Sequence, residues 1–503
     1  MKKETKNIKK QDIIFIVWIA LIILALIIIS VVIYFQNSHE ELNKPTPTPT
    51  TPTTSPTPFI TPSPTPGDNV DADAEYKYEF PRNANISLNP TLDFELTIGG
   101  DGSDTLSEVI TLKNSYLFGT TNSSKGDFIS PTSVDCCLSV VNENGRLIKA
   151  TTFGTVLDDY ILLVKPIIKQ NQNDENSFIV VTKNIEEKNT FYIYKILEES
   201  LSVSSTKLTL GENLKYAKGI TYKDKVMLAV TAQEKGASSG YFVTISKDLA
   251  ITTSKKIEGV EFVDLLYTPK KTILLGNTTD VKKTLVITEF SNAEINDVNK
   301  TILQDKERKC REMIPVSTGG YLIPYEFMSD GLKKMGVLKL TAGFSIEFDH
   351  ILKGDSYKDV FILNDFGMSE LKGFHIFATS ENKGNYSTYY ENICVHGDLN
   401  DSMADIFEGV KAVKIIKNDE NYVVIGESYV NASIDIAVVG MNKQLSVLFN
   451  YKYGGNGIDI PKGGIINSMG RLLVFGTTTS TGNDVTRNFG KGDIWVINPN
   501  IER

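Results

Sequence analysis

The chain has 503 residues, and 41% of them are hydrophobic, which is enough apolar side-chain material for a large core. Its formal net charge is −9 and basic residues cluster only at the extreme N-terminus, so nucleic acid is not an expected partner. Four cysteines without a Cys-x-x-Cys spacing indicate neither a disulfide scaffold nor a structural zinc site.

The N-terminal part of the sequence predicts an anchor followed by a stalk. Residues 13–35 are almost entirely apolar and exceed the roughly 20 residues that a helix needs to cross a bilayer. The lysine-rich residues 1–12 precede this run and are expected to remain in the cytoplasm. A cleaved signal peptide is the less favoured alternative, because no small-x-small cleavage site follows. Residues 36–75 form a Pro-Thr-rich linker, whose composition is typical of an extended extracellular stalk.

Residues 76–503 predict strands without helices. Apolar and β-branched runs alternate with Gly, Asn, Asp and Ser turns, and the pattern repeats about every 50 residues. A repeat of this length that consists of strands alone is typical of a β-propeller. The expected first strands begin near Glu108, Ile161, Ala217, Phe262, Met313, Val360, Ala412 and Gly464. The expected second strands are 116–119, 178–182, 226–231, 272–276, 321–325, 375–379, 422–426 and 472–476.

The two ends of the repeat region complement each other. The last unit stops after its third strand, whereas residues 92–98 match the fourth strand of the seventh unit at 448–453. Both segments lead directly into Gly-Gly-x-Gly-x-Asp, at 99–104 and at 454–459. We therefore expect the N-terminal strand to complete the last blade and close the ring, which removes two open sheet edges.

The repeat resembles that of bacterial cell-surface and secreted β-propeller proteins. In both, Gly-Gly-x-Gly-x-Asp is followed by a strand ending in Gly-x-Thr, here at 116–121 and 472–478, and then by Asp-x-Trp-Val, here at 493–496. The resemblance implies an all-β fold with a single propeller of about eight four-stranded blades. Seven blades are the alternative, because the second and sixth units depart from the pattern. It also implies exposure at the cell surface, but no particular chemistry.

The turns between the predicted blades are acidic and contain tyrosines. In a propeller such turns gather around one mouth of the central channel, where carboxylates can bind Ca²⁺ and tyrosine rings can stack on sugars. A pair of carboxylates could also act as acid and base on a glycoside. The favoured interpretation is structural, with each aspartate capping its own turn. The candidate ligand-binding residues are Asp101, Asp104, Asp159, Tyr160, Asp355, Tyr357, Asp405 and Asp459.

No catalytic motif stands out. The string 236–240 fits Gly-x-Ser-x-Gly but is not followed by the helix that a nucleophile elbow needs, so it predicts a flexible loop. We expect His375 to be a half-buried packing residue. Cys136 and Cys137 alternate along a predicted strand, so we expect one in the core and one facing outward.

The sequence as a whole predicts a single-pass membrane protein with a cytoplasmic N-terminus and an extracellular propeller. The expected function is a non-catalytic binding or scaffold module, with wall polysaccharide or a surface protein as partner, and with no cofactor unless Ca²⁺ binds. The alternative is a carbohydrate-active hydrolase or lyase that uses carboxylates at the propeller mouth.

Overall fold

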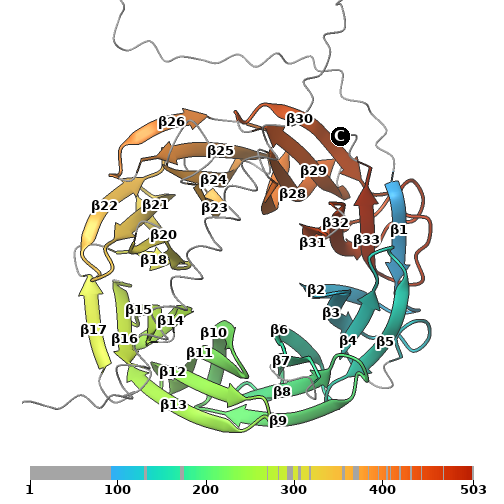
Figure 1. Ribbon diagram of the computed structural model, residues 1–503, viewed down its shortest axis with the longest axis horizontal. Helices are drawn as coiled ribbons and strands as arrows, with labels where there is room; N and C mark the ends of the chain where they lie inside the picture. Colours follow the sequence, from blue (N-terminus) through green and yellow to red (C-terminus); the bar gives the residue numbers. More distant parts are fainter. Residues whose placement is uncertain are drawn as a thin grey trace, which may run out of the picture. The chain divides into compact units, whose positions relative to one another are not determined.

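Eight antiparallel sheets surround a common axis in the computed structural model (Figure 1). The expected tail, membrane helix and stalk at residues 1–75 lie outside the described residues; within the described part of the chain, no helix is long and apolar enough to cross a bilayer. The structure describes residues 92–500 apart from 130–132, 170–174, 269, 281–282, 292–297, 304–306, 317–318, 354–356, 366–372, 383–384, 395, 404–405, 408, 419–420, 431–432, 443 and 468–469.

Each sheet is one blade, and in blades 1 to 7 the strands run in chain order from the axis outward (Figure 1). Blades 1 to 4 contain β2 (Asp104–Thr111), β3 (Ser115–Thr121), β4 (Asp135–Val141) and β5 (Leu147–Phe153); β6 (Asp159–Ile167), β7 (Ser177–Asn184), β8 (Thr190–Leu197) and β9 (Val203–Thr209); β10 (Asn213–Tyr222), β11 (Lys225–Glu234), β12 (Ala237–Ser246) and β13 (Ile251–Glu258); and β14 (Val260–Tyr267), β15 (Lys271–Thr278), β16 (Leu285–Ser291) and β17 (Val298–Leu303).

The remaining blades complete the ring, and the count of eight confirms the favoured prediction. Blades 5 to 8 contain β18 (Lys309–Cys310), β19 (Ile314–Pro315), β20 (Tyr321–Ser329), β21 (Leu332–Leu340) and β22 (Ile346–Ile351); β23 (Tyr357–Asp365), β24 (Gly373–Asn382), β25 (Asn385–Ile393) and β26 (Leu399–Met403); β27 (Val410–Asn418), β28 (Asn421–Val430), β29 (Ser433–Asn442) and β30 (Val447–Tyr453); and β31 (Asp459–Ile466), β32 (Leu472–Thr478), β33 (Asp493–Pro499) and β1 (Leu92–Ile98).

The N-terminal strand β1 closes the ring, as the sequence predicts. It pairs antiparallel with β33, and the register includes Glu95 opposite Ile497 and Ile98 opposite Ile494. The indole Nε1 of the buried Trp495 donates a hydrogen bond of 3.0 Å to Glu95 Oε1. The first and last described strands therefore belong to one sheet, and their pairing joins the two ends of the ring.

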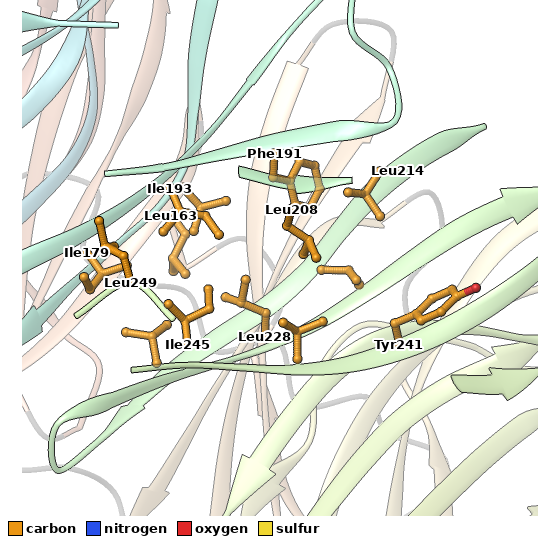
Figure 2. Close-up of a cluster of buried hydrophobic side chains, with 14 of the residues drawn as sticks. Leu163, Ile179, Phe191, Ile193, Leu208, Leu214, Leu228, Tyr241, Ile245 and Leu249 are labelled. Carbon is orange, nitrogen blue, oxygen red and sulfur yellow. The ribbon is translucent and has the colours of Figure 1, made fainter. Parts of the chain in front are cut away.

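Apolar side chains fill the spaces between neighbouring blades. Figure 2 shows the cluster between blades 2 and 3, where Phe191 and Ile193 of β8 face Leu228 of β11 and Ile245 of β12. Full burial of such a side chain stabilises the fold by about 1.5–3 kcal/mol. Because each blade lies between two others, its middle strands are covered on both faces and read as continuous apolar runs.

This two-sided burial corrects the prediction for the paired cysteines. Cys136 and Cys137 do point to opposite faces of β4, but both are fully buried. Cys136 packs in the cluster shared with blade 2, and Cys137 packs in the cluster shared with blade 8. The expectation that one would face outward was wrong because neither face of a middle strand meets solvent.

Candidate functional site: the turn face of the ring

We call the side of the ring at which the innermost strands begin the turn face. Asp104 is the first residue of β2, it is fully buried, and it caps the glycine turn that precedes it. Its Oδ2 accepts hydrogen bonds from Gly100 N at 2.7 Å and from Ser123 Oγ at 2.8 Å. Burial raises the pKa of this carboxyl, while hydrogen bonds from Thr121, Ser123 and Gly100 oppose the shift.

The second copy of the motif folds in the same way in blade 8. Asp459 is the first residue of β31, and its Oδ2 accepts hydrogen bonds from Gly455 N at 3.0 Å and from Ser480 Oγ at 2.8 Å. Burial again raises the pKa. The sequence Gly-Gly-x-Gly-x-Asp thus forms the same capped turn at two places in the ring.

The other described aspartates of the predicted set also lie in turns. Asp101 is exposed and accepts bonds from Ser124 N, Ser124 Oγ and Lys125 N, and the hydroxyl of Ser124 is the largest of several hydrogen bonds that lower its pKa. Asp159 is fully buried at the start of β6 and accepts a bond from Thr155 N; burial raises its pKa.

The structure distributes the predicted residues along the turn face instead of gathering them in one site. Asp101 and Asp104 lie between blades 8 and 1, Asp159 and Tyr160 between blades 1 and 2, and Asp459 between blades 7 and 8. No hydrogen bond or ion pair among the described residues connects one of these groups to another. Tyr357 begins β23 in blade 6, where its side chain is not described, and Asp355 and Asp405 lie outside the described residues.

Sequence reasoning missed a second carboxylate at these junctions. Asp493, the first residue of β33, is fully buried and accepts a hydrogen bond of 2.6 Å from Phe489 N. Burial, assisted by the nearby Asp104 and Asp127, raises its pKa to about 6. Asp435 in β29 has a corresponding place beside Asp459, and its pKa is raised by burial and by Asp459. The Asp-x-Trp-Val motif, which occurs once in the sequence at 493–496, carried this signal for Asp493.

Large apolar side chains are exposed on the turn face beside blades 1 and 2. Val156 and Tyr160 lie at the turn between β5 and β6, and they are 84% and 41% exposed. Ile129 and Ile185, which are 62% and 58% exposed, follow β3 and β7. Ile129 lies close to the end of β5, because its carbonyl oxygen accepts a bond from Thr152 Oγ1. We call these four residues the blade 1–2 patch.

A second aromatic feature of the turn face was also missed. Tyr386 and Tyr429 stack with ring centroids 4.8 Å apart, at the tips of the hairpins of blades 6 and 7. Tyr429 donates a hydrogen bond of 2.6 Å to Glu427, whose other oxygen is 3.0 Å from Lys411 Nζ. Tyr429 of this pair is 39% exposed.

Groups suited to nucleophilic or metal chemistry are scarce in the described part of the chain. No three His, Cys, Asp or Glu side chains there are arranged to hold a metal ion. His375 is buried, more fully than expected, and bonds Tyr390 Oη at 2.7 Å, while His350 pairs with the buried Glu391. The Gly-x-Ser-x-Gly string does not form a loop, because Ala237 already begins strand β12; no helix follows it.

Comparison with family models and with curated proteins finds no match. Solved structures match at low identity. The WD40 domain of SCAP from fission yeast is 11% identical, with a TM-score of 0.45, over 82% of this chain and 97% of that chain. Sqt1 from Chaetomium thermophilum is 9% identical, with a TM-score of 0.45, over 82% and 99%.

An enzyme is among the similar structures as well. A post-proline cleaving enzyme from Rickettsia typhi is 9% identical, with a TM-score of 0.43, over 75% of this chain and 58% of that chain. Similarities at this level carry no argument about function. The fold assignment rests on the eight sheets themselves.

Proposed function

We propose that this chain is a membrane-anchored, extracellular β-propeller that acts as a non-catalytic binding or scaffold module at the bacterial cell surface. The observation that carries the proposal is the blade 1–2 patch. Four large apolar side chains are exposed on one face of two neighbouring blades, and this favours an interaction surface because their burial against a partner is favourable.

The position of the chain entry agrees with this proposal. Strand β1 runs toward the turn face, where it ends at Ile98, so Leu92 lies at the opposite face beside Pro499. The N-terminal end of β1 therefore lies at the face opposite the patch.

The hydrolase or lyase alternative is less well supported. Acid–base catalysis on a sugar requires two carboxylates that both reach the glycosidic bond. The carboxylates that come together at the turn face, Asp104 and Asp493, are both fully buried. Their raised pKa values follow from burial between blades and not from placement in an open cleft.

Retention on purified cell-wall polysaccharide tests the proposal. The soluble fragment 76–503 should be retained without release of soluble sugar, and Val156→Asp should abolish retention because it places a charge in the patch. Leu448→Asp is the matched control, since Leu448 is 55% exposed but lies on the outermost strand β30. Release of sugar would contradict the non-catalytic role. If the wall is not bound, a surface-protein partner should be captured by the wild type and by Leu448→Asp but not by Val156→Asp.

A further inference from the structure

Two buried carboxylates converge on Gly99 at the junction between blades 8 and 1. A Cβ atom added to Gly99 would lie 1.9 Å from Asp493 Oδ1 and 2.8 Å from Asp104 Oδ2, so only glycine fits between them. Phe489 N donates to the other oxygen of Asp493. The Oδ1 atoms of both aspartates are buried and accept no hydrogen bond of good geometry, although the Thr121 hydroxyl is near enough to Asp104 to lower its pKa.

The junction between blades 7 and 8 repeats this arrangement. A Cβ atom on Gly454 would lie 2.5 Å from Asp459 Oδ2 and 2.7 Å from Asp435 Oδ1. The Oδ1 atoms of Asp435 and Asp459 are also buried without a hydrogen-bond partner. Buried carboxylate oxygens are rarely left unpaired, and their recurrence at equivalent places indicates a bound species that satisfies them.

The charge around each pair is also unbalanced. Asp127 and Asp484 supply a third carboxylate at the two junctions; their Oδ2 atoms accept bonds from Gly99 N and Gly454 N, each at 3.1 Å. Among the largest influences on the pKa of these carboxylates, the cations are Arg487 for Asp493 and Lys452 for Asp435. Three carboxylates against one cation leave an excess of negative charge in a desolvated place, which is costly without a counter-charge.

We propose that each of these two junctions binds one divalent cation with the ligand preference of Ca²⁺. Asp104 and Asp493 would hold the first ion, and Asp435 and Asp459 the second. Ca²⁺ accepts oxygen ligands in flexible geometry and takes further ligands from water and backbone carbonyls, so it does not require three converging side chains. Because Asp104 lies just after β1 in the chain and Asp493 begins β33, the first ion links the N-terminal and C-terminal segments whose pairing closes the ring.

Calorimetric titration of the full-length chain with Ca²⁺ at pH 7.5, after treatment with a chelator, tests this site. We expect binding of two ions at the high-micromolar to millimolar affinity of extracellular sites, and a rise in the thermal unfolding midpoint when Ca²⁺ is added. Asp493→Asn keeps the shape of the side chain and should weaken one site by roughly tenfold or more, since charge count sets Ca²⁺ affinity. Asp435→Asn should weaken the other site.

Asp101→Asn is the matched control. It removes the same charge from the same glycine turn, but Asp101 is exposed and already accepts three hydrogen bonds. An equal loss of Ca²⁺ binding in this variant would overturn the proposal, because it would indicate general surface acidity. If Asp493→Asn does not fold, Asp127→Asn gives the same test at the edge of the site. The proposal would also be overturned if the thermal unfolding midpoint of the wild type rose on acidification but not on addition of millimolar Ca²⁺. Each pair of carboxylates would then share a proton instead of binding an ion.

Discussion

Arg308 shows how one buried charged side chain can link the innermost and outermost strands of a single blade. It is fully buried, and its Nη2 lies 2.8 Å from Asp349 Oδ2. Tyr325 donates a hydrogen bond of 2.5 Å to the other oxygen of Asp349, and its ring lies 5.3 Å from the guanidinium carbon. Asp349 belongs to the outermost strand of blade 5, and Arg308 immediately precedes its innermost one.

Replacing Arg308 should therefore lower the stability of the folded protein. Arg308→Met removes a buried ion pair, and we expect the free energy of unfolding to fall by about 3 kcal/mol. Urea unfolding followed by tryptophan fluorescence measures this. Arg471→Met, at an exposed hairpin position, is the control and should change stability by less than about 0.5 kcal/mol. Equal midpoints for both variants would contradict the role of Arg308.

The pH dependence of stability should reveal Asp493. Its pKa is raised from 3.8 to about 6 in the folded protein, so folding favours the protonated form. Asp493 therefore contributes up to roughly 3 kcal/mol to the free energy of unfolding. This contribution is fully present below about pH 4 and is lost as the pH rises through about 6. Urea unfolding in chelator between pH 4 and pH 7 should show this decline, and Asp493→Asn should reduce it. A slope that is the same in both proteins would refute the assignment.

The candidate site could be predicted from the sequence only in part. Asp104 and Asp459 follow from a local motif, and their capping role is a local hydrogen-bonding pattern. Asp493 reaches Asp104 from another blade, so their proximity depends on the closure of the ring and has no local signal. Tyr386 and Tyr429 likewise meet only because blades 6 and 7 are neighbours.

At the scale of the element, β-bulges explain where the strand predictions failed. The second strands were predicted within β3, β7, β11, β15, β20, β24, β28 and β32, and all are confirmed. Most first strands begin several residues before the predicted position. In all blades but the fifth, the innermost strand contains a bulge, as between Leu106 and Glu108 in β2. A bulge inserts one extra residue into the strand. The alternation of inward and outward side chains after the bulge is therefore out of step with the alternation before it.

The residue after the bulge often connects to the next blade. Glu108 accepts a hydrogen bond of 2.8 Å from Val164 N of blade 2, and Asp264 accepts one of 2.6 Å from Met313 N of blade 5. Lys218 of blade 3 lies 3.6 Å from Asp264. The innermost strands are therefore linked by side chains where they approach the axis, in addition to the apolar contacts farther out.

Blade 5 departs from the pattern because of Pro324. Proline has no backbone N–H, so β20 cannot pair continuously with an innermost strand. The innermost strand is divided into β18 and β19, and the residues between them loop out opposite Ile323 and Pro324. Charged side chains surround Glu326 here, and their pairing lowers its pKa to about 2 although burial opposes the shift.

This cluster gives a prediction for the fifth blade. Glu326→Gln removes the common partner of Lys309, Arg311 and Lys333, and we expect a loss of about 1–2 kcal/mol in unfolding free energy, because two of the three cations are partly exposed. The loss should shrink in 1 M NaCl, since salt screens exposed charges. An effect independent of salt would mean that packing of the side chain, and not charge, is responsible.

At the scale of the whole molecule, the propeller depends on a strand that lies at the start of the repeat region in sequence. The Gly-Gly-x-Gly-x-Asp motif allowed this closure to be predicted, because the same motif follows β1 and β30. The blade number depends on weak units in the middle of the chain, and only the pairing of strands resolves it as eight. The segment before β1 then joins the ring at its closure.

The most direct measurement compares two truncations of the chain. Removing residues 1–91 keeps β1, whereas removing residues 1–100 deletes it together with its bond to Trp495. The second protein exposes the edge of β33 and loses the buried side chain of Ile98 and the packing of Leu96, so we expect several kcal/mol of destabilisation and a much shorter proteolytic half-life. Equal half-lives for the two proteins would contradict closure of the ring by β1.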